Sequence, residues 1–179
     1  MRTFSSVINR PDKSEYDPYY ERYISLVPDG DVISTLSTQI GETLALLRGL
    51  PASVSDHRYA PDKWTVKELV GHIADSERIF AYRALRIARA DKTPIEGFEQ
   101  DDYVKNGGFD QRTVGNLARE FEQVRRATIS LFRNLEPAAW ERTGIANKIE
   151  ISVRALAYII AGHELHHKAI LKDRYGLGI

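Results

Sequence analysis

Cysteine is absent from this 179-residue chain, and its acidic and basic side chains balance. Without thiols the protein can form neither a disulfide nor a thiolate metal site, so imidazole or carboxylate groups must hold any transition metal. The 25 basic and 25 acidic residues leave no net charge to attract nucleic acid or an anionic lipid surface. We therefore expect neither nucleic acid nor a membrane among the partners.

Long apolar runs are also missing. No stretch of the chain approaches the roughly 20 apolar residues that a bilayer-spanning helix needs. The first residues, up to Asp17, lack the uninterrupted apolar segment of a signal peptide. These absences predict a cytoplasmic protein.

Apolar residues recur at helical spacing in four segments of the chain. The predicted helices cover approximately residues 32–48, 66–90, 112–135 and 153–175. Thr65 and Glu68 form a capping-box pattern at the start of the second segment, and Asp31 and Ser152 can cap the first and the fourth. Four long amphipathic helices without an alternating strand pattern predict an all-α protein, specifically a four-helix bundle.

Three segments lie outside these helices. The polar and tyrosine-rich residues 1–30 are predicted to form an arm packed on the bundle domain of residues 31–179, with its tyrosines serving packing rather than recognition. A turn signal at 147–148 indicates a small hairpin within 142–152. The link at 93–111 is long enough to suggest a functional loop. It offers possible residues for the mouth of a site, namely Asp101, Asp102 and Tyr103.

Histidines supply the clearest chemical signal. His163 and His167 are four residues apart on one predicted helix, so their side chains point within about 40° of each other. His72 lies beside Ile73 on the second predicted helix and should face inward, and metal sites in bundles are built from facing helices. The pattern predicts a divalent-metal site at His72, His163 and His167. The alternative is that each is a core histidine with a satisfied hydrogen bond.

The remaining histidines are assigned other roles. His166 also shares a face with His163, but its angular offset is larger, so we place it beside the site or at the surface. His57 lies between Asp56 and Arg58 in a predicted loop and is expected to be solvated.

Residues 163–167 also match the H-E-x-x-H pattern of zinc peptidases, in which the glutamate is the general base. The extended pattern would place a turning glycine at position 170 and a third ligand at position 173. Ile170 continues the helix instead, which rotates Asp173 away from the histidines by roughly 240°. The peptidase interpretation is therefore disfavoured, and Glu164 is interpreted as a carboxylate at the surface or beside the metal ligands.

Polar side chains near His72 have two possible roles. Asp75 and Ser76 follow His72 by three and four residues, so they could orient a ligand or hold a bound water. Alternatively, Asp75 forms an ion pair with Arg78 or Arg83. The neighbouring arginines either recognise a substrate carboxylate or form a solvated, ion-paired face; they are Arg78, Arg83, Arg86, Arg89, Arg125 and Arg126.

The segment WTVKELVGHIADSER at 64–78, followed by GHELHH at 162–167, resembles the DinB-like (YfiT-like) superfamily. The resemblance extends from about Asp31 to Tyr175. It implies a four-helix bundle, frequent homodimers, and a divalent metal held by His72 on the second helix and by His163 and His167 on the fourth. Members of known activity are thiol-dependent S-transferases and isomerases that use thiols such as bacillithiol or mycothiol.

Three imidazole ligands leave open coordination positions, which distinguishes a catalytic metal site from a closed structural one. Zinc or nickel is expected, and iron or copper would also bind. The sequence therefore predicts a metal-dependent enzyme for a small-molecule substrate, of the S-transferase type with a low-molecular-weight thiol or of the hydrolase type. The alternatives are a non-catalytic metal-binding stress-response module and the zinc peptidase.

Overall fold

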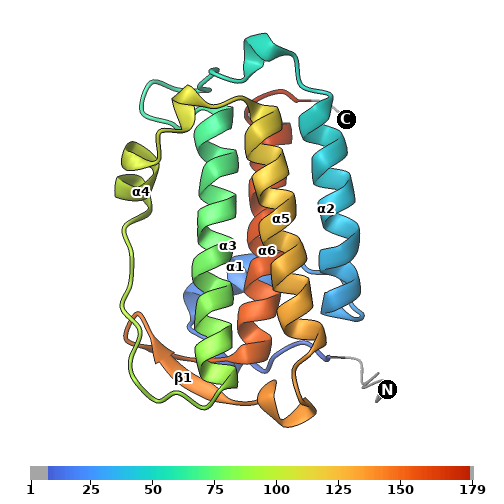
Figure 1. The fold of residues 1–179 in the computed structure, drawn as a ribbon, viewed down its shortest axis with the longest axis vertical. Helices are drawn as coiled ribbons and strands as arrows, with labels where there is room; N and C mark the ends of the chain where they lie inside the picture. The colour runs from blue at the N-terminus through green and yellow to red at the C-terminus, as the bar shows by residue number, and fades with distance from the viewer. Residues whose placement is uncertain (1–7, 178–179) are drawn as a thin grey trace.

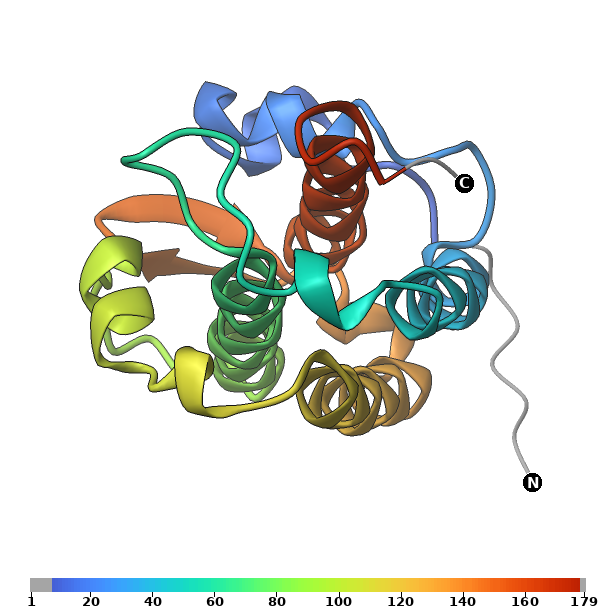
Figure 2. The same cartoon turned by 90° about the horizontal axis from the view of Figure 1, so that it is seen from above.

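Four long helices form the body of the protein in the computed structural model, which describes residues 8–177 (Figure 1). They are α2 (Val32–Arg48), α3 (Val66–Ala88), α5 (Val114–Arg133) and α6 (Val153–Asp173). Helices α2 and α3 each pack against both α5 and α6, so α2 and α3 lie at opposite corners of the bundle (Figure 2). The predicted all-α fold and the four-helix bundle are confirmed.

Side-chain caps explain where the long helices begin. Thr65 and Glu68 form the predicted capping box of α3: the Thr65 hydroxyl accepts from the Glu68 backbone N–H, and the Glu68 carboxylate accepts from that of Thr65. Asp31 and Ser152 cap α2 and α6 as expected. Helix α5 begins at Val114, close to the predicted start, because the Thr113 hydroxyl accepts the capping hydrogen bond from the Asn116 backbone N–H.

The N-terminal segment contains three short helices, η1 (Lys13–Glu15), η2 (Pro18–Tyr20) and α1 (Glu21–Ile24), and α1 packs against α6. Its contact with α6 is close, because a Cβ atom at Gly162 would lie 2.0 Å from the carbonyl oxygen of Tyr23. Side chains of the segment also join the hydrophobic core. These core residues are Tyr16, Tyr20, Tyr23, Ile24 and Val27.

The link between α3 and α5 is more ordered than the sequence suggested. It contains the helix α4 (Gln100–Asn106) and the turn η4 (Phe109–Gln111). Before α4 the link runs beside a β-hairpin, where the Ile95 N–H donates to the carbonyl of Ile145 (2.9 Å). The sequence analysis described 93–111 only as a long link and did not predict this helix. Helix α4 escaped notice because it is short and buries only Val104.

The predicted hairpin is present between α5 and α6. Strands β1 (Thr143–Ala146) and β2 (Ile149–Ser152) pair antiparallel, and they are the only strands within residues 8–177. Asn147 and Lys148 connect them with φ angles of 52° and 65°, the left-handed values of a type I′ turn. In the same part of the chain, no helix combines the length and apolar character that crossing a bilayer requires.

Candidate metal centre

Three imidazole rings meet where α3 packs against α6. His72 on α3 and His163 on α6 place their Nε2 atoms 3.2 Å apart, and Nε2 of His167 lies 3.1 Å from Nε2 of His163. One nitrogen from each ring lies within 4.8 Å of the other two. The i, i+4 spacing on α6 and the adjacency of α3 therefore bring together the three histidines that the sequence selected.

Burial keeps these rings neutral. It lowers the pKa of His72 from 6.5 to about 4. Burial also lowers the pKa of His163 and His167 well below the ordinary value, and the mutual proximity of the rings adds to the effect. Neutral imidazole is the form that donates a lone pair to a metal.

The hydrogen-bonding of the cluster fits a cation. A neutral imidazole has one N–H and one lone pair, so three converging Nε2 atoms cannot all satisfy one another. In addition, Nδ1 of His167 is buried without a hydrogen-bond partner among the described residues. A divalent ion that accepts the three Nε2 lone pairs would remove the conflict among the converging Nε2 atoms. Each Nδ1 would then carry the proton and be free to donate it. The residues present therefore fit a metal.

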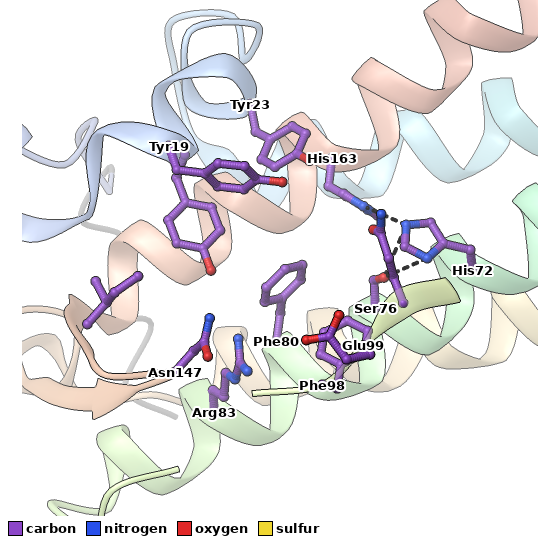
Figure 3. Close-up of a pocket in the computed structure, with 13 residues that line it drawn as sticks. Tyr19, Tyr23, His72, Ser76, Phe80, Arg83, Phe98, Glu99, Asn147 and His163 are labelled. Carbon is purple, nitrogen blue, oxygen red and sulfur yellow. Dashed lines mark hydrogen bonds between the residues drawn. The ribbon is translucent and has the colours of Figure 1, made fainter. Parts of the chain in front are cut away.

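A cavity of about 330 Å³ lies beside the cluster and ends on His72 and His163 (Figure 3). Tyrosine and phenylalanine side chains form a large part of its wall, and Arg83 lies at the other end. The wall includes Tyr19, Tyr20 and Tyr23 from the N-terminal segment, Phe80 from α3 and Phe98 from the link.

A second cavity, of about 420 Å³, reaches His167. Tyr59, Trp64 and Tyr175 contribute to its wall. Gln100, the first residue of α4, lines both cavities. The histidine cluster can therefore be approached from two directions.

The two polar residues that follow His72 have different surroundings. The Ser76 hydroxyl is buried 3.4 Å from Nδ1 of His72, in position to orient that ring. Asp75 instead forms an ion pair with Arg78 at 3.1 Å, the second of the two roles considered for it. The structure thus brings Ser76 to the cluster and turns Asp75 away from it.

Glu164 is buried rather than at the surface. The Thr43 hydroxyl donates to its Oε1 (2.5 Å), and Nη1 of Arg125 lies 2.7 Å from its Oε2. Arg125 is itself fully buried and also forms a two-pronged contact with Glu77. With both oxygens held by protein groups, Glu164 is badly placed to act as the general base of a peptidase.

The guanidinium of Arg125 neutralises only part of the negative charge of the carboxylates around it. Although burial lowers the pKa of Arg125, the charges of Glu77 and Glu164 outweigh burial and raise it above its ordinary value. Two carboxylates and one guanidinium leave one net negative charge inside the bundle. Because Glu164 is adjacent to His163, one of the two carboxylates lies on the helix that carries two of the three imidazoles.

The other histidines stay outside the cluster. His166 is half-buried, with its ring centroid 5.3 Å from that of Tyr23, and burial lowers its pKa. His57 is exposed, as expected, and its ring approaches Tyr175.

Sequence reasoning missed the cavity wall contributed by the N-terminal segment. Its tyrosines were assigned to packing, yet Tyr19, Tyr20 and Tyr23 also face the cavity beside the histidines. Only the close spacing of aromatic residues hinted at this role. Of the residues suggested for the mouth, Asp101 lines the second cavity, whereas Asp102 and Tyr103 line neither.

Known proteins share this fold and sequence pattern. A curated protein of Oceanobacillus iheyensis named "Putative metal-dependent hydrolase OB0413" is 28% identical over 142 residues, covering 78% of this chain and 79% of that protein. YfiT from Bacillus subtilis, described as a probable metal-dependent hydrolase with an unusual four-helix bundle topology, matches with a TM-score of 0.70 at 18% identity over 93% of each chain.

Two further solved structures are similar in fold. A mycothiol-dependent maleylpyruvate isomerase gives a TM-score of 0.62 at 10% identity, over 76% of this chain and 58% of that one. A DinB-like protein of Bacillus subtilis, YjoA, gives 0.54 at 21% identity, over 78% and 85%. The family profile of the DinB superfamily matches residues 35–171. The resemblance inferred from the sequence is thus confirmed, and the chain belongs to the DinB superfamily.

Proposed function

We propose that this protein is a divalent-metal-dependent enzyme acting on small molecules, with His72, His163 and His167 as the metal ligands. The main support is that three buried, neutral imidazoles converge at the end of a cavity. Imidazole donors without thiolates favour zinc or nickel, and iron or copper is compatible. When bound, the ion would supply a Lewis acid that lowers the pKa of a thiol or water reaching the same place.

The surrounding residues would prepare the site. Trp64 packs against His72 with ring centroids 4.6 Å apart, and Tyr23 and Phe80 pack against His163 at 5.3 Å and 5.9 Å. These rings would limit the access of water and hold the imidazole planes. The net negative charge around Arg125 would offset part of the positive charge of a dication, which stabilises it inside the bundle.

Among reactions of this type, thiol-dependent S-transfer is our first candidate and hydrolysis the second. Two cavities reach the histidine cluster, one ending on His72 and His163 and the other on His167, which suits a reaction of two substrates. In S-transfer the thiolate sulfur would form a bond to an electrophilic carbon, the leaving group would depart with its electron pair, and the thiol proton would pass to solvent. Hydrolysis is favoured by the name of the curated relative.

Elemental analysis tests the metal site. We expect roughly one divalent metal ion per chain, lost in His163→Ala because one of three ligands is removed. His57→Ala is the matched control, since His57 is exposed and is not a member of the cluster, and should keep its metal. A folded wild-type protein that takes up none of zinc, nickel, iron or copper would contradict the proposal.

The reaction is tested with metal-loaded protein, monochlorobimane and one thiol at a time, including bacillithiol and mycothiol. A thiol-dependent rise in bimane fluorescence, lost in His163→Ala, is expected for S-transfer. Hydrolysis of carboxylic esters without a thiol would favour the second candidate. Loss of thermal stability on chelation, without turnover in either assay, would favour a non-catalytic metal-binding module.

The family resemblance also leads us to propose a homodimer, and we propose separately that the protein is cytoplasmic. Light scattering of the purified protein should give twice the chain mass of 20.3 kDa. A monomer at micromolar concentration would contradict the dimer.

A further inference from the structure

Arg83 is a buried cation without a carboxylate partner. Its residue is only 3% exposed, and no ion pair to it occurs within residues 8–177. Nη2 donates to the carbonyl of Glu96 at 3.1 Å, and the guanidinium also interacts with the Tyr20 hydroxyl, which is not a carboxylate. Nε is buried without a hydrogen-bond partner among the described residues. Arg125, the other arginine buried to this degree, is held by two carboxylates. Because buried charges in proteins are almost always paired, the missing partner of Arg83 points to a ligand.

The position of Arg83 relates it to the histidine cluster. It follows His72 by 11 residues on α3, which is three turns with an offset of only about 20°, so both residues lie on one face of the helix. Ser76 and Phe80 occupy the turns between them. The rise along the helix between the two residues is about 16 Å.

The same cavity connects the two ends. Figure 3 shows His72 and His163 at one end and Arg83, beside Asn147, at the other. The wall between them includes five tyrosine and phenylalanine rings, which suit an apolar or aromatic body. The charged residues that line this cavity are Arg83 and the exposed Glu99, since the histidines are neutral.

The charge and shape of the Arg83 guanidinium limit the class of ligand that it can bind. One guanidinium facing a cavity that also carries Glu99 suits a single negative charge better than a double one. Its Nε has no hydrogen-bond partner among the described residues, and the planar donor arrangement of a guanidinium matches a carboxylate. A phosphate monoester, which carries close to two charges, would meet more repulsion from Glu99.

We propose that Arg83 binds the carboxylate of an elongated monocarboxylate substrate whose apolar body fills the aromatic cavity and whose other end reaches His72 and His163. The placement of the reacting end rests on the proposed function. The binding of the carboxylate by Arg83 does not depend on it.

Isothermal titration calorimetry with 4-phenylbutyrate and its neutral amide tests the charge requirement. We expect the acid to bind at least about tenfold more tightly than the amide, because a charge-assisted hydrogen bond is lost in the amide. The titrations are repeated after chelator treatment, since a carboxylate could also bind a metal directly. Equal affinities for acid and amide in the chelator-treated protein would overturn the proposal.

Variants of Arg83 identify the residue responsible. Arg83→Gln should abolish the preference for the acid, and Arg83→Lys should keep part of it because the charge remains. The matched control is Arg86→Gln, one turn further along α3, where the arginine is paired with Asp91 at 2.6 Å; it should bind the acid within about twofold of wild type. An acid preference that survives in Arg83→Gln would refute the assignment.

The thermal stability of the Arg83 variants distinguishes a binding role of Arg83 from a structural role. Replacing an unpaired buried cation by a neutral side chain should leave the melting temperature unchanged or raise it. If Arg83→Gln nevertheless fails to fold, Arg83 has a structural role and the proposal fails, unless Arg83→Lys folds and shows a reduced preference for the acid.

Two further arms complete the test. Tighter Arg83-dependent binding of 3-phenylpropyl phosphate than of 4-phenylbutyrate would overturn the choice of a carboxylate.

His163→Ala should lose its metal but still prefer the acid to the amide. A wild-type protein that takes up no metal but still prefers the acid would therefore contradict the proposed function alone. Absence of the acid preference in wild-type protein that does hold its metal would contradict this inference alone.

Discussion

Protonation of single histidines should govern the stability of the metal-free protein below neutral pH. In the unfolded chain His72 takes up a proton near pH 6.5, whereas burial holds its pKa in the native state at about 4. Between these values the unfolded state binds more protons, so stability falls as the pH falls from 6.5 toward 4. The shift corresponds to at most about 3 kcal/mol for His72 alone.

Urea unfolding of chelator-treated protein at pH 7.5, 5.5 and 4.5 measures this effect. His72→Phe should weaken the pH dependence, because it removes one of the titrating groups, and His57→Gln should leave it unchanged. A wild-type free energy of unfolding that stays constant from pH 7.5 to 4.5 would be incompatible with three buried neutral histidines.

Arg125 should be among the most sensitive single residues in the protein. Its removal in Arg125→Met leaves the carboxylates of Glu77 and Glu164 buried without a counter-charge. Breaking a buried ion pair from one side costs about 3–5 kcal/mol. The neighbouring variant Arg126→Met loses only an exposed pair with Glu122 and should cost no more than about 0.5 kcal/mol. Chemical denaturation of both variants gives the comparison, and equal losses would contradict the prediction.

At the residue scale the sequence predicted the histidines but not the partners of Glu164. The i, i+4 spacing of His163 and His167 is a local property that survives in any α-helix. The contact between Thr43 and Glu164 joins residues 121 positions apart. Such a contact depends on which helices are neighbours and in what register, which helical periodicity alone does not determine.

The packing of α1 on α6 depends on the absence of a side chain at Gly162. Gly162→Ala would place Cβ 2.0 Å from the backbone oxygen of Tyr23, and no rotamer change can relieve a clash with backbone. We expect a loss of about 1–3 kcal/mol. We also expect weaker 4-phenylbutyrate binding, because Tyr23 lines the cavity.

The control for this variant is Gly41→Ala on α2, where a Cβ atom meets nothing within 4 Å. There the substitution should stabilise the protein by about 0.5–1 kcal/mol, the usual gain of alanine over glycine inside a helix. Urea unfolding measures whether each substitution raises or lowers the free energy of unfolding. Stabilisation in both variants would show that α1 can move away from α6 without cost.

Helices and strands were predictable from the sequence where the residues that mark their ends are close together in the chain. The capping residues Thr65 and Ser152 located two helix starts, and the turn at Asn147 and Lys148 indicated the hairpin. Helix α4 has seven residues, fewer than the window over which an apolar stripe becomes visible. It is held in place by contacts with α3, which are properties of the assembled bundle.

At the scale of the whole molecule, the candidate site combines residues inside the range that matches the family with a wall contributed by residues that precede it. The three histidines lie within residues 35–171, which match the DinB superfamily. Tyr19, Tyr20 and Tyr23 precede that range but line the cavity. The histidine cluster was therefore recognisable from family-wide patterns, whereas the cavity wall depended on how a preceding segment folds back onto α6.

Removing residues 1–27 tests whether this segment is an accessory arm or part of the folded unit. Five large side chains would be lost from the hydrophobic core, among them Ile24 with 1% and Val27 with 2% exposure. Deleting one such side chain commonly costs about 2–4 kcal/mol, and the total stability of a domain is only about 5–15 kcal/mol. We therefore expect the truncated chain to lose its fixed tertiary packing, seen as a loss of near-ultraviolet circular dichroism and of a cooperative urea transition. Removing residues 1–7 alone is the control, because it leaves every contact within residues 8–177 in place. A cooperative transition for residues 28–179 would instead support the predicted division at residue 30, with the bundle folding independently and the tyrosine segment acting as a cover over a site that is already formed.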